Sequence, residues 1–152
     1  MTTAISSEEK LRHINRMLSE ISDIYQKLLL TKNVTESAFI VMSSILELGE
    51  GCSQKDIVER SYINKKTVNS TIKKLQKEDF IELKAGKYPN LHIYLTDKGR
   101  EYINENIIPI IKIENEVLDN MTESEFSVLV DTYKKYIDNF RVHVEKFSDL
   151  HE

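Results

Sequence analysis

The stretch that decides the fold runs from Ser53 to Gly99 and reads SQKDIVERSYINKKTVNSTIKKLQKEDFIELKAGKYPNLHIYLTDKG. Its pattern predicts two short helices joined by a tight turn, followed by a β-hairpin with a basic tip. Ser53 is expected to cap the first helix with Asp56 as its capping-box partner, and Asn64 to cap the second. This order of elements is that of a winged helix-turn-helix.

The second short helix has a buried stripe and a basic outer face. Val68, Ile72 and Leu75 recur at intervals of four and three and predict the buried side. The residues left facing outward, or partly so, are Lys65, Lys66, Asn69, Ser70, Lys73 and Lys77. Lysine contacts phosphate, and asparagine can pair bidentately with adenine in the major groove. These residue types suit a helix that reads DNA.

The predicted hairpin pairs strands at 80–83 and 91–95 around a tip at 84–90. The tip holds Lys84, Lys87, a tyrosine and Asn90, which suits contact with a DNA groove or backbone. An ordinary surface hairpin is the alternative. Charge favours the first interpretation, because residues 53–92 contain nine basic and five acidic side chains, while the whole chain carries a net charge of −4.

Composition bounds the remaining possibilities. The chain has 152 residues, of which 40% are hydrophobic and 30% charged, so we expect a folded protein with neither a membrane span nor an export signal, located in the cytoplasm. Cys52 is the only cysteine and is expected to be a packing residue. The four histidines lack metal-ligand spacing. We find no catalytic constellation and expect no enzyme activity and no cofactor.

Long helices are predicted on both sides of this stretch. Residues 7–30 carry an apolar stripe from Leu11 to Leu28, which suits either a core helix or a dimerisation helix. Thr35 is the predicted N-cap of a second helix, which the sequence Gly49-Glu50-Gly51 should end.

The C-terminal part is predicted to be helical as well. Thr96 should cap a helix over 97–120, kinked because Pro109 deprives the carbonyl of Glu105 of its donor. Thr122 should cap a last helix with a broad aromatic stripe, which we expect to pack into a partner. We therefore predict a mainly α protein with a small β-hairpin wing. Its three regions are an N-terminal dimerisation helix at 1–34, a winged helix-turn-helix lobe at 35–96 and C-terminal dimerisation helices at 97–152.

With these residues in place, the chain resembles the MarR family of bacterial transcription regulators over roughly residues 7–147. The best matching parts are 53–58, 63–75 and Leu95-Thr96-Asp97-Lys98-Gly99. Two positions depart from the family pattern. Asp79 stands where a glycine usually follows the recognition helix, and Lys87-Tyr88-Pro89-Asn90 replaces an aspartate-x-arginine pair in the wing.

The resemblance implies a homodimeric, ligand-responsive repressor that binds a pseudo-palindromic operator in double-stranded DNA. It also implies a small-molecule pocket between the dimerisation helices and the lobe, which Met17, Tyr25, Phe39 and Met42 would line, although core packing explains each of them more simply. The predicted DNA contacts are Ser53, Gln54, Lys55, Lys65, Lys66, Thr67, Asn69, Ser70, Lys73, Lys84, Lys87 and Asn90. A metal- or redox-sensing regulator of the same fold remains an alternative, as does a winged-helix protein-interaction module that binds no DNA.

Overall fold

A computed structural model describes residues 5–86 and 91–149. The chain divides into two compact units, Met1–Ile110 and Ile111–Glu152. Among the helices of the described residues, none combines the length and the apolar character needed to cross a membrane.

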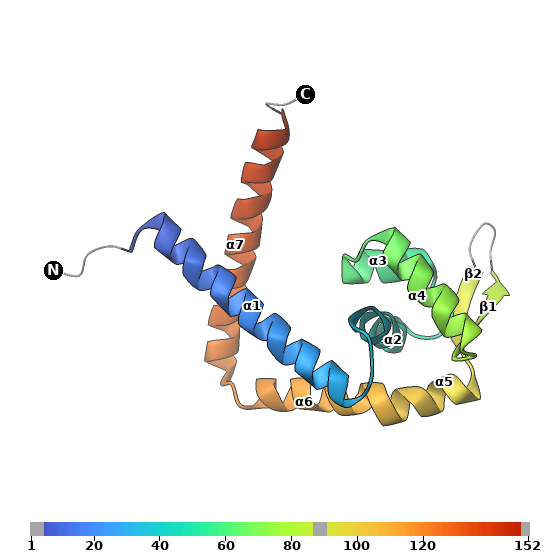
Figure 1. Cartoon of the computed structure of the whole chain (residues 1–152). Helices are drawn as coiled ribbons and strands as arrows, with labels where there is room; N and C mark the ends of the chain where they lie inside the picture. Colours follow the sequence, from blue (N-terminus) through green and yellow to red (C-terminus); the bar gives the residue numbers. More distant parts are fainter. Residues whose placement is uncertain (1–4, 87–90, 150–152) are drawn as a thin grey trace. The chain divides into compact units, whose positions relative to one another are not determined.

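The first unit contains a lobe in which three helices pack around one apolar core (Figure 1). These helices are α2 (Glu36–Leu48), α3 (Gln54–Ser61) and α4 (Lys65–Lys77). The most deeply buried apolar side chains of the three helices are Val41, Met42, Ile45, Ile57, Val68, Ile72 and Leu75. The buried stripe predicted for α4 is therefore confirmed, and Thr71, which is also buried, widens it.

Side chains fix the start of each of these helices. Thr35 caps α2 and accepts a hydrogen bond from the amide of Ala38. Ser53 caps α3 in a complete capping box, and Asn64 caps α4. Gly49, with a φ of 87°, ends α2 in a conformation that L-residues rarely adopt. The three predicted N-caps and the predicted glycine stop are all confirmed.

The hairpin consists of β1 (Ile81–Ala85) and β2 (Leu91–Leu95), paired antiparallel. A short stretch before α3 adds a third, partial strand, since the amide of Gly51 donates to the carbonyl of Ile93 at 2.8 Å. The amide of Ile93 donates in return to the carbonyl of Cys52 at 2.9 Å. The sequence pattern did not indicate this third strand, which joins the middle of β2 to the residues before α3.

The single helix predicted over 97–120 is interrupted. The structure has α5 (Asp97–Tyr102), a π-helical segment η1 (Ile103–Ile107) and α6 (Ile108–Asp119). Pro109 has no amide hydrogen to donate to the carbonyl of Glu105. That carbonyl instead accepts a hydrogen bond at 3.1 Å from Nζ of Lys32, at the end of α1. The wider turn of η1 thus lies where the proline removes a regular helical bond.

The start of α5 approaches the turn after α4 closely. Thr96 caps α5 and its hydroxyl donates to the carbonyl of Asp79 at 2.6 Å. A Cβ atom added at Gly99 would lie only 1.8 Å from the carbonyl oxygen of Phe80. Asp79 has a φ of 61°, in the left-handed region that aspartate tolerates. Close approach therefore requires glycine at position 99, whereas position 79 accepts aspartate.

Each unit also carries a long helix with exposed apolar side chains. In the first unit, α1 (Ser7–Thr31) buries Leu29 and exposes Leu11, Met17, Leu18, Ile21 and Ile24. In the second unit, α7 (Glu123–Asp149) begins at Thr122, whose hydroxyl accepts from the amide of Glu125 at 3.3 Å. Its exposed apolar residues include Phe126, Leu129, Val130, Tyr133, Ile137, Phe140 and Val144.

Candidate nucleic-acid interface

The N-terminal ends of α3 and α4 border a groove of about 1020 Å³ in the helical lobe. The residues that line it are Ser53, Gln54, Lys55, Val58, Asn64, Lys65, Lys66, Asn69 and Leu91. Six of the residues predicted to bind DNA are among them. The groove therefore brings together residues from α3, α4 and the end of β2 that lies next to the hairpin tip.

Ser53 holds the start of α3 rather than presenting its side chain to the groove. Its hydroxyl and its amide both donate to Oδ2 of Asp56, at 2.8 and 2.7 Å. The same hydroxyl accepts from the amide of Asp56 at 3.2 Å, and only 7% of the residue is exposed. These hydrogen bonds hold the pKa of the Asp56 carboxyl below its usual value. Lys55 is exposed, and Gln54 is half-buried beside it.

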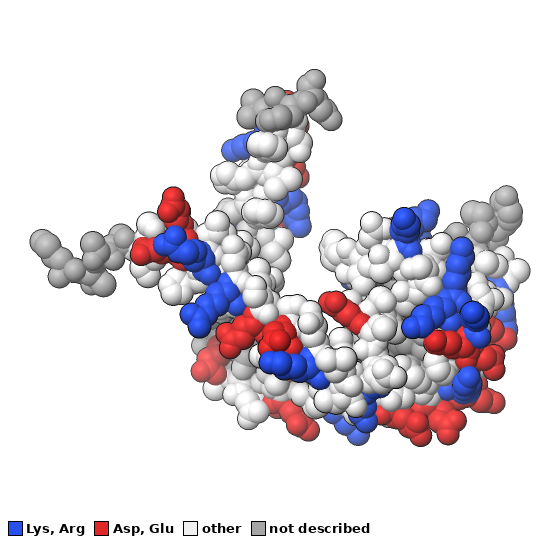
Figure 2. All heavy atoms as spheres, viewed as in Figure 1, with Lys and Arg blue, Asp and Glu red and all other residues white. Residues whose placement is uncertain are grey.

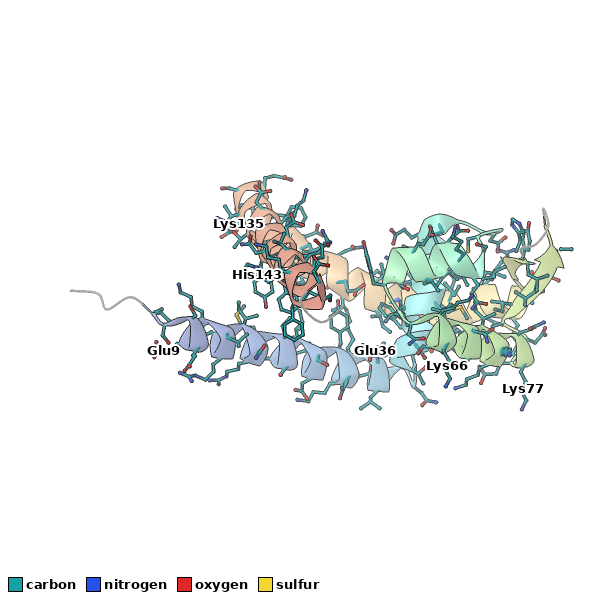
Figure 3. The ribbon with its side chains drawn as sticks, turned by 90° about the horizontal axis from the view of Figure 1, so that it is seen from above. Glu9, Glu36, Lys66, Lys77, Lys135 and His143 are labelled. Carbon is teal, nitrogen blue, oxygen red and sulfur yellow. The ribbon has the colours of Figure 1, made fainter. Side chains whose placement is uncertain are left out.

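The exposed side of α4 carries positive charge that remains available. Its lysines are Lys65, Lys66, Lys73, Lys74 and Lys77, all exposed. None of them forms an ion pair with a described residue. Blue side chains gather over this helix in Figure 2, and Figure 3 shows Lys66 and Lys77 projecting from it. Because no neighbouring carboxylate compensates these charges, they are free to neutralise an external polyanion.

The remaining predicted residues of α4 differ in their surroundings. Asn69 is half-buried and lines the groove. Ser70 is exposed, and its hydroxyl donates to the carbonyl of Thr67 at 2.9 Å. Thr67 and Lys73 are exposed but lie outside the groove lining. Among these four residues, Asn69 is thus the one that lines the groove.

The hairpin differs from its prediction at Lys84. This residue lies in β1 opposite His92, so placing it in the tip was wrong. Its Nζ atom is 2.6 Å from Oε1 of Glu82 and 4.9 Å from the centre of the Tyr94 ring. The hydrogen bond to Glu82 raises the pKa of Lys84. Lys87 and Asn90 lie outside the described residues.

Two apolar residues of the groove were not predicted. Val58 in α3 is half-buried, and Leu91, the first residue of β2, is exposed. Both line the groove between the polar residues. Their exposure follows from the way α3 and the hairpin meet, which sequence periodicity does not reveal.

Glu50 is a further residue that sequence reasoning missed. Its carboxylate accepts hydrogen bonds from Arg100 through both oxygens, and from the amide of Leu95 at 3.2 Å. The bonds from Arg100 are the main reason that the pKa of Glu50 is lowered. This carboxylate ties the loop before α3 to the junction between β2 and α5. In the sequence, its position between Gly49 and Gly51 was the one indication of this role.

Cys52 is buried in the same loop, as predicted for a packing residue. Loss of hydration raises the pKa of its thiol, and the nearby Asp56 carboxylate adds to the effect. In the described part of the chain, no group of three or more histidine, cysteine, aspartate or glutamate side chains is placed to hold a metal ion.

The four residues proposed for a ligand pocket have different environments. Phe39 and Met42 belong to the core of α2, whereas Met17 is 68% exposed on α1. Tyr25 is half-buried. A pocket of about 290 Å³ lies at the corner of α1 and α2, and none of the four lines it. Its lining residues are Gln26, Leu29, Leu30, Asn33, Val34, Thr35 and Glu36.

Comparison with known proteins agrees with this architecture. Residues 32–87 match the sequence model of the MarR family. A search of curated proteins gave no match. Among solved structures, the MarR family regulator NMB1585 from Neisseria meningitidis has a TM-score of 0.79 at 17% identity, over 90% of this chain and 97% of that one.

Two further structures extend the comparison. One is BpsR from Bordetella bronchiseptica, a protein whose DNA binding is regulated by 6-hydroxynicotinic acid. It has a TM-score of 0.67 at 19% identity, over 88% of this chain and 98% of that one. MepR from S. aureus, solved in complex with DNA, has a TM-score of 0.67 at 17% identity, over 89% and 96% of the two chains. The match to the MarR family thus covers the helical lobe, and nearly the whole chain shares its fold with solved structures of MarR family regulators.

Proposed function

We propose that this protein is a homodimeric, sequence-specific DNA-binding transcription regulator, and a repressor that releases DNA when a small molecule binds. The observation that carries the proposal is the groove at the starts of α3 and α4, which joins Lys55, Lys65, Lys66 and Asn69 on one surface. No catalytic step is required of any of these residues.

The chemistry of the groove suits a duplex. The lysines supply charge for phosphates on either side of the major groove, where an α-helix fits. The amide of Asn69 can both donate to and accept from the edge of adenine. Gln54 and Lys55, at the start of α3, suit the phosphate backbone beside it. Base recognition would thus come from α4, and contacts with the phosphate backbone from both α3 and α4.

The exposed apolar side chains of α1 and α7 support a dimer. Burying such side chains contributes about 25 cal/mol per Å², and stable interfaces bury on the order of 1,600 Å² in total. A two-fold dimer would present two copies of α4 to two half-sites, which is why we propose a pseudo-palindromic operator. The DNA complex of MepR and the regulation of BpsR by 6-hydroxynicotinic acid support, by similarity of fold, both DNA binding and a small-molecule effector.

The test begins with duplexes selected from random DNA by the wild-type protein. Binding of Asn69→Ala and Lys66→Ala is then measured on the selected and on a scrambled duplex at several salt concentrations. Loss of Asn69 should cost about 1–3 kcal/mol on the selected duplex and little on the scrambled one. Loss of Lys66 should weaken both and lower the salt slope by about 0.9 for each phosphate that the protein no longer neutralises.

Lys112→Ala serves as the matched control, because this lysine is exposed on α6 and is not among the residues that line the groove. It should leave both affinities unchanged. Lys87→Ala, in the predicted wing tip, should behave like Lys66→Ala if the wing touches the DNA backbone. A wild-type protein that binds no duplex, at low salt as well, would instead favour the protein-interaction module. Equal losses of Asn69→Ala on both duplexes would contradict base recognition by that side chain.

A further inference from the structure

Tyr62, in the turn between α3 and α4, is an aromatic residue that its own chain leaves uncovered. It is 92% exposed, more than any other large hydrophobic side chain of the described residues. Its φ of 56° lies in the left-handed region, which glycine and asparagine adopt more readily than tyrosine. Neither core packing nor turn geometry therefore explains why a tyrosine stands here.

The backbone around Tyr62 is held in place. Its amide donates to the carbonyl of Val58 at 3.0 Å and so ends α3. The hydroxyl of Ser61 donates to the carbonyl of Ile57 at 2.6 Å and accepts from the amide of Ile63 at 3.3 Å. These bonds fix the turn on both sides of the residue. The phenol ring is thus displayed from a rigid base instead of a loose loop.

The turn lies directly beside the candidate interface. Asn64, two residues after Tyr62, lines the groove and caps α4 through a 2.7 Å bond from the amide of Lys66. Two Cα–Cα steps span about 7.6 Å at most, so the Cα atom of Tyr62 cannot lie far from that of Asn64. A duplex that contacts Asn64 and Lys65 therefore comes within reach of an extended phenol side chain.

We infer that Tyr62 is a further DNA-binding residue, whose phenol hydroxyl donates a hydrogen bond to a backbone phosphate next to the major groove occupied by α4. This inference rests on the proposed DNA-binding function and adds an interaction of a different kind. Tyrosine is rigid and amphipathic, so it orders at low entropic cost. It is also uncharged, whereas the other phosphate-binding residues proposed on α4 are lysines.

That difference makes the role of Tyr62 separable from that of the lysines. Removing a lysine that binds phosphate reduces both the affinity and the slope of log affinity against log salt, because fewer counterions are released. Removing a neutral donor to phosphate reduces affinity and leaves the slope unchanged. A hydrogen bond to the DNA backbone also carries no base information, so binding to selected and scrambled duplexes should weaken equally.

The experiment measures Tyr62→Phe and Tyr62→Asn against wild type on both duplexes across a range of salt concentrations. Tyr62→Phe removes only the hydroxyl and should weaken binding about 5- to 10-fold for each half-site, with an unchanged salt slope. Tyr62→Asn keeps a residue that suits the left-handed turn. It should lose at least as much affinity while its melting temperature stays the same or rises, which separates a binding role from a structural one.

A double-mutant cycle locates the hydrogen bond on the DNA. Duplexes with a neutral methylphosphonate at single backbone positions should include one position on which wild type and Tyr62→Phe bind equally. Tyr62→Phe that binds as tightly as wild type on unmodified duplex would overturn the inference, as would a reduced salt slope. Both results leave DNA binding by the wild type intact. A wild type that binds no duplex at all refutes the proposed function itself, and the inference with it.

Discussion

Replacing Gly99 by alanine should destabilise the lobe, because the new methyl group meets backbone instead of a flexible side chain. The added Cβ would lie 1.8 Å from the carbonyl oxygen of Phe80 and 2.8 Å from its carbonyl carbon. To reach even the 3.0 Å below which real contacts essentially never fall, α5 must move away from the turn after α4. That movement strains the hydrogen bond from the amide of Thr96 to the same carbonyl, which is 3.2 Å long.

The expected loss of folding stability can be estimated from these interactions. Overpacking typically costs about 1–3 kcal/mol, and loss of one backbone hydrogen bond about 1 kcal/mol. The better helix propensity of alanine offsets up to about 1 kcal/mol of this loss of stability. We therefore expect Gly99→Ala to lower the free energy of unfolding by about 1–3 kcal/mol. Urea titrations followed by circular dichroism at one fixed protein concentration would measure it.

Glu101→Ala is the matched control, since Glu101 is exposed on the same short helix. It should change the free energy of unfolding by no more than about 0.5 kcal/mol. A Gly99→Ala variant with the urea midpoint of the wild type would refute the reasoning. It would mean that α5 and the turn before β1 can separate without loss of stability.

Three other changes test separate features of the molecule. Deleting residues 123–152 should yield a monomer or an aggregate, because α7 carries much of the exposed apolar surface. Light scattering would measure this, and a well-folded, DNA-binding monomer would contradict the proposed dimer. Cys52→Ser should bind the selected duplex like wild type. Wild-type Cys52 should react slowly with thiol reagents at neutral pH, because burial raises the pKa of its thiol. If the wild type responds to an oxidant and the variant does not, the redox-sensor alternative is restored. The Asp56 carboxylate has a lowered pKa, so its contribution is complete above the usual aspartate pKa and disappears as pH falls through the folded-state value. The stability advantage of wild type over Asp56→Asn should therefore stay constant from neutral pH down to the usual aspartate pKa and shrink as the pH falls further, and an advantage that persists at the lowest pH would show that the capping box does not require the charge.

Local features of this chain could be predicted well. The first helix was expected at 7–30 and lies at Ser7–Thr31. The caps at Thr35, Ser53 and Asn64 depend only on residues two or three positions away, and short-range periodicity was enough for the stripe on α4. Such features need no knowledge of what packs against them, and this is why residue types and spacing sufficed.

The features that the sequence did not reveal depend on residues that lie far apart in the chain. Sequence position could not reveal the partner of the Glu105 carbonyl, because Lys32 lies 73 residues earlier. The partial strand before α3 depends on pairing with Ile93, and Lys84 joins β1 because of its partner across the hairpin. In the candidate interface, residue types indicated the lysines and Asn69. They did not indicate that Tyr62 is displayed.

The partial strand has a consequence for how the lobe opens. The amides of Gly51 and Ile93 each donate across it, so both hydrogens are protected from exchange with solvent until the middle of β2 separates from the residues just before α3. The two segments therefore behave as one cooperative unit, although about 40 residues separate them in sequence. We therefore expect a substitution that loosens the middle of β2 to increase fraying of the first turn of α3 as well. The stability of the hairpin and the order of the first turn of α3 are therefore coupled in this molecule.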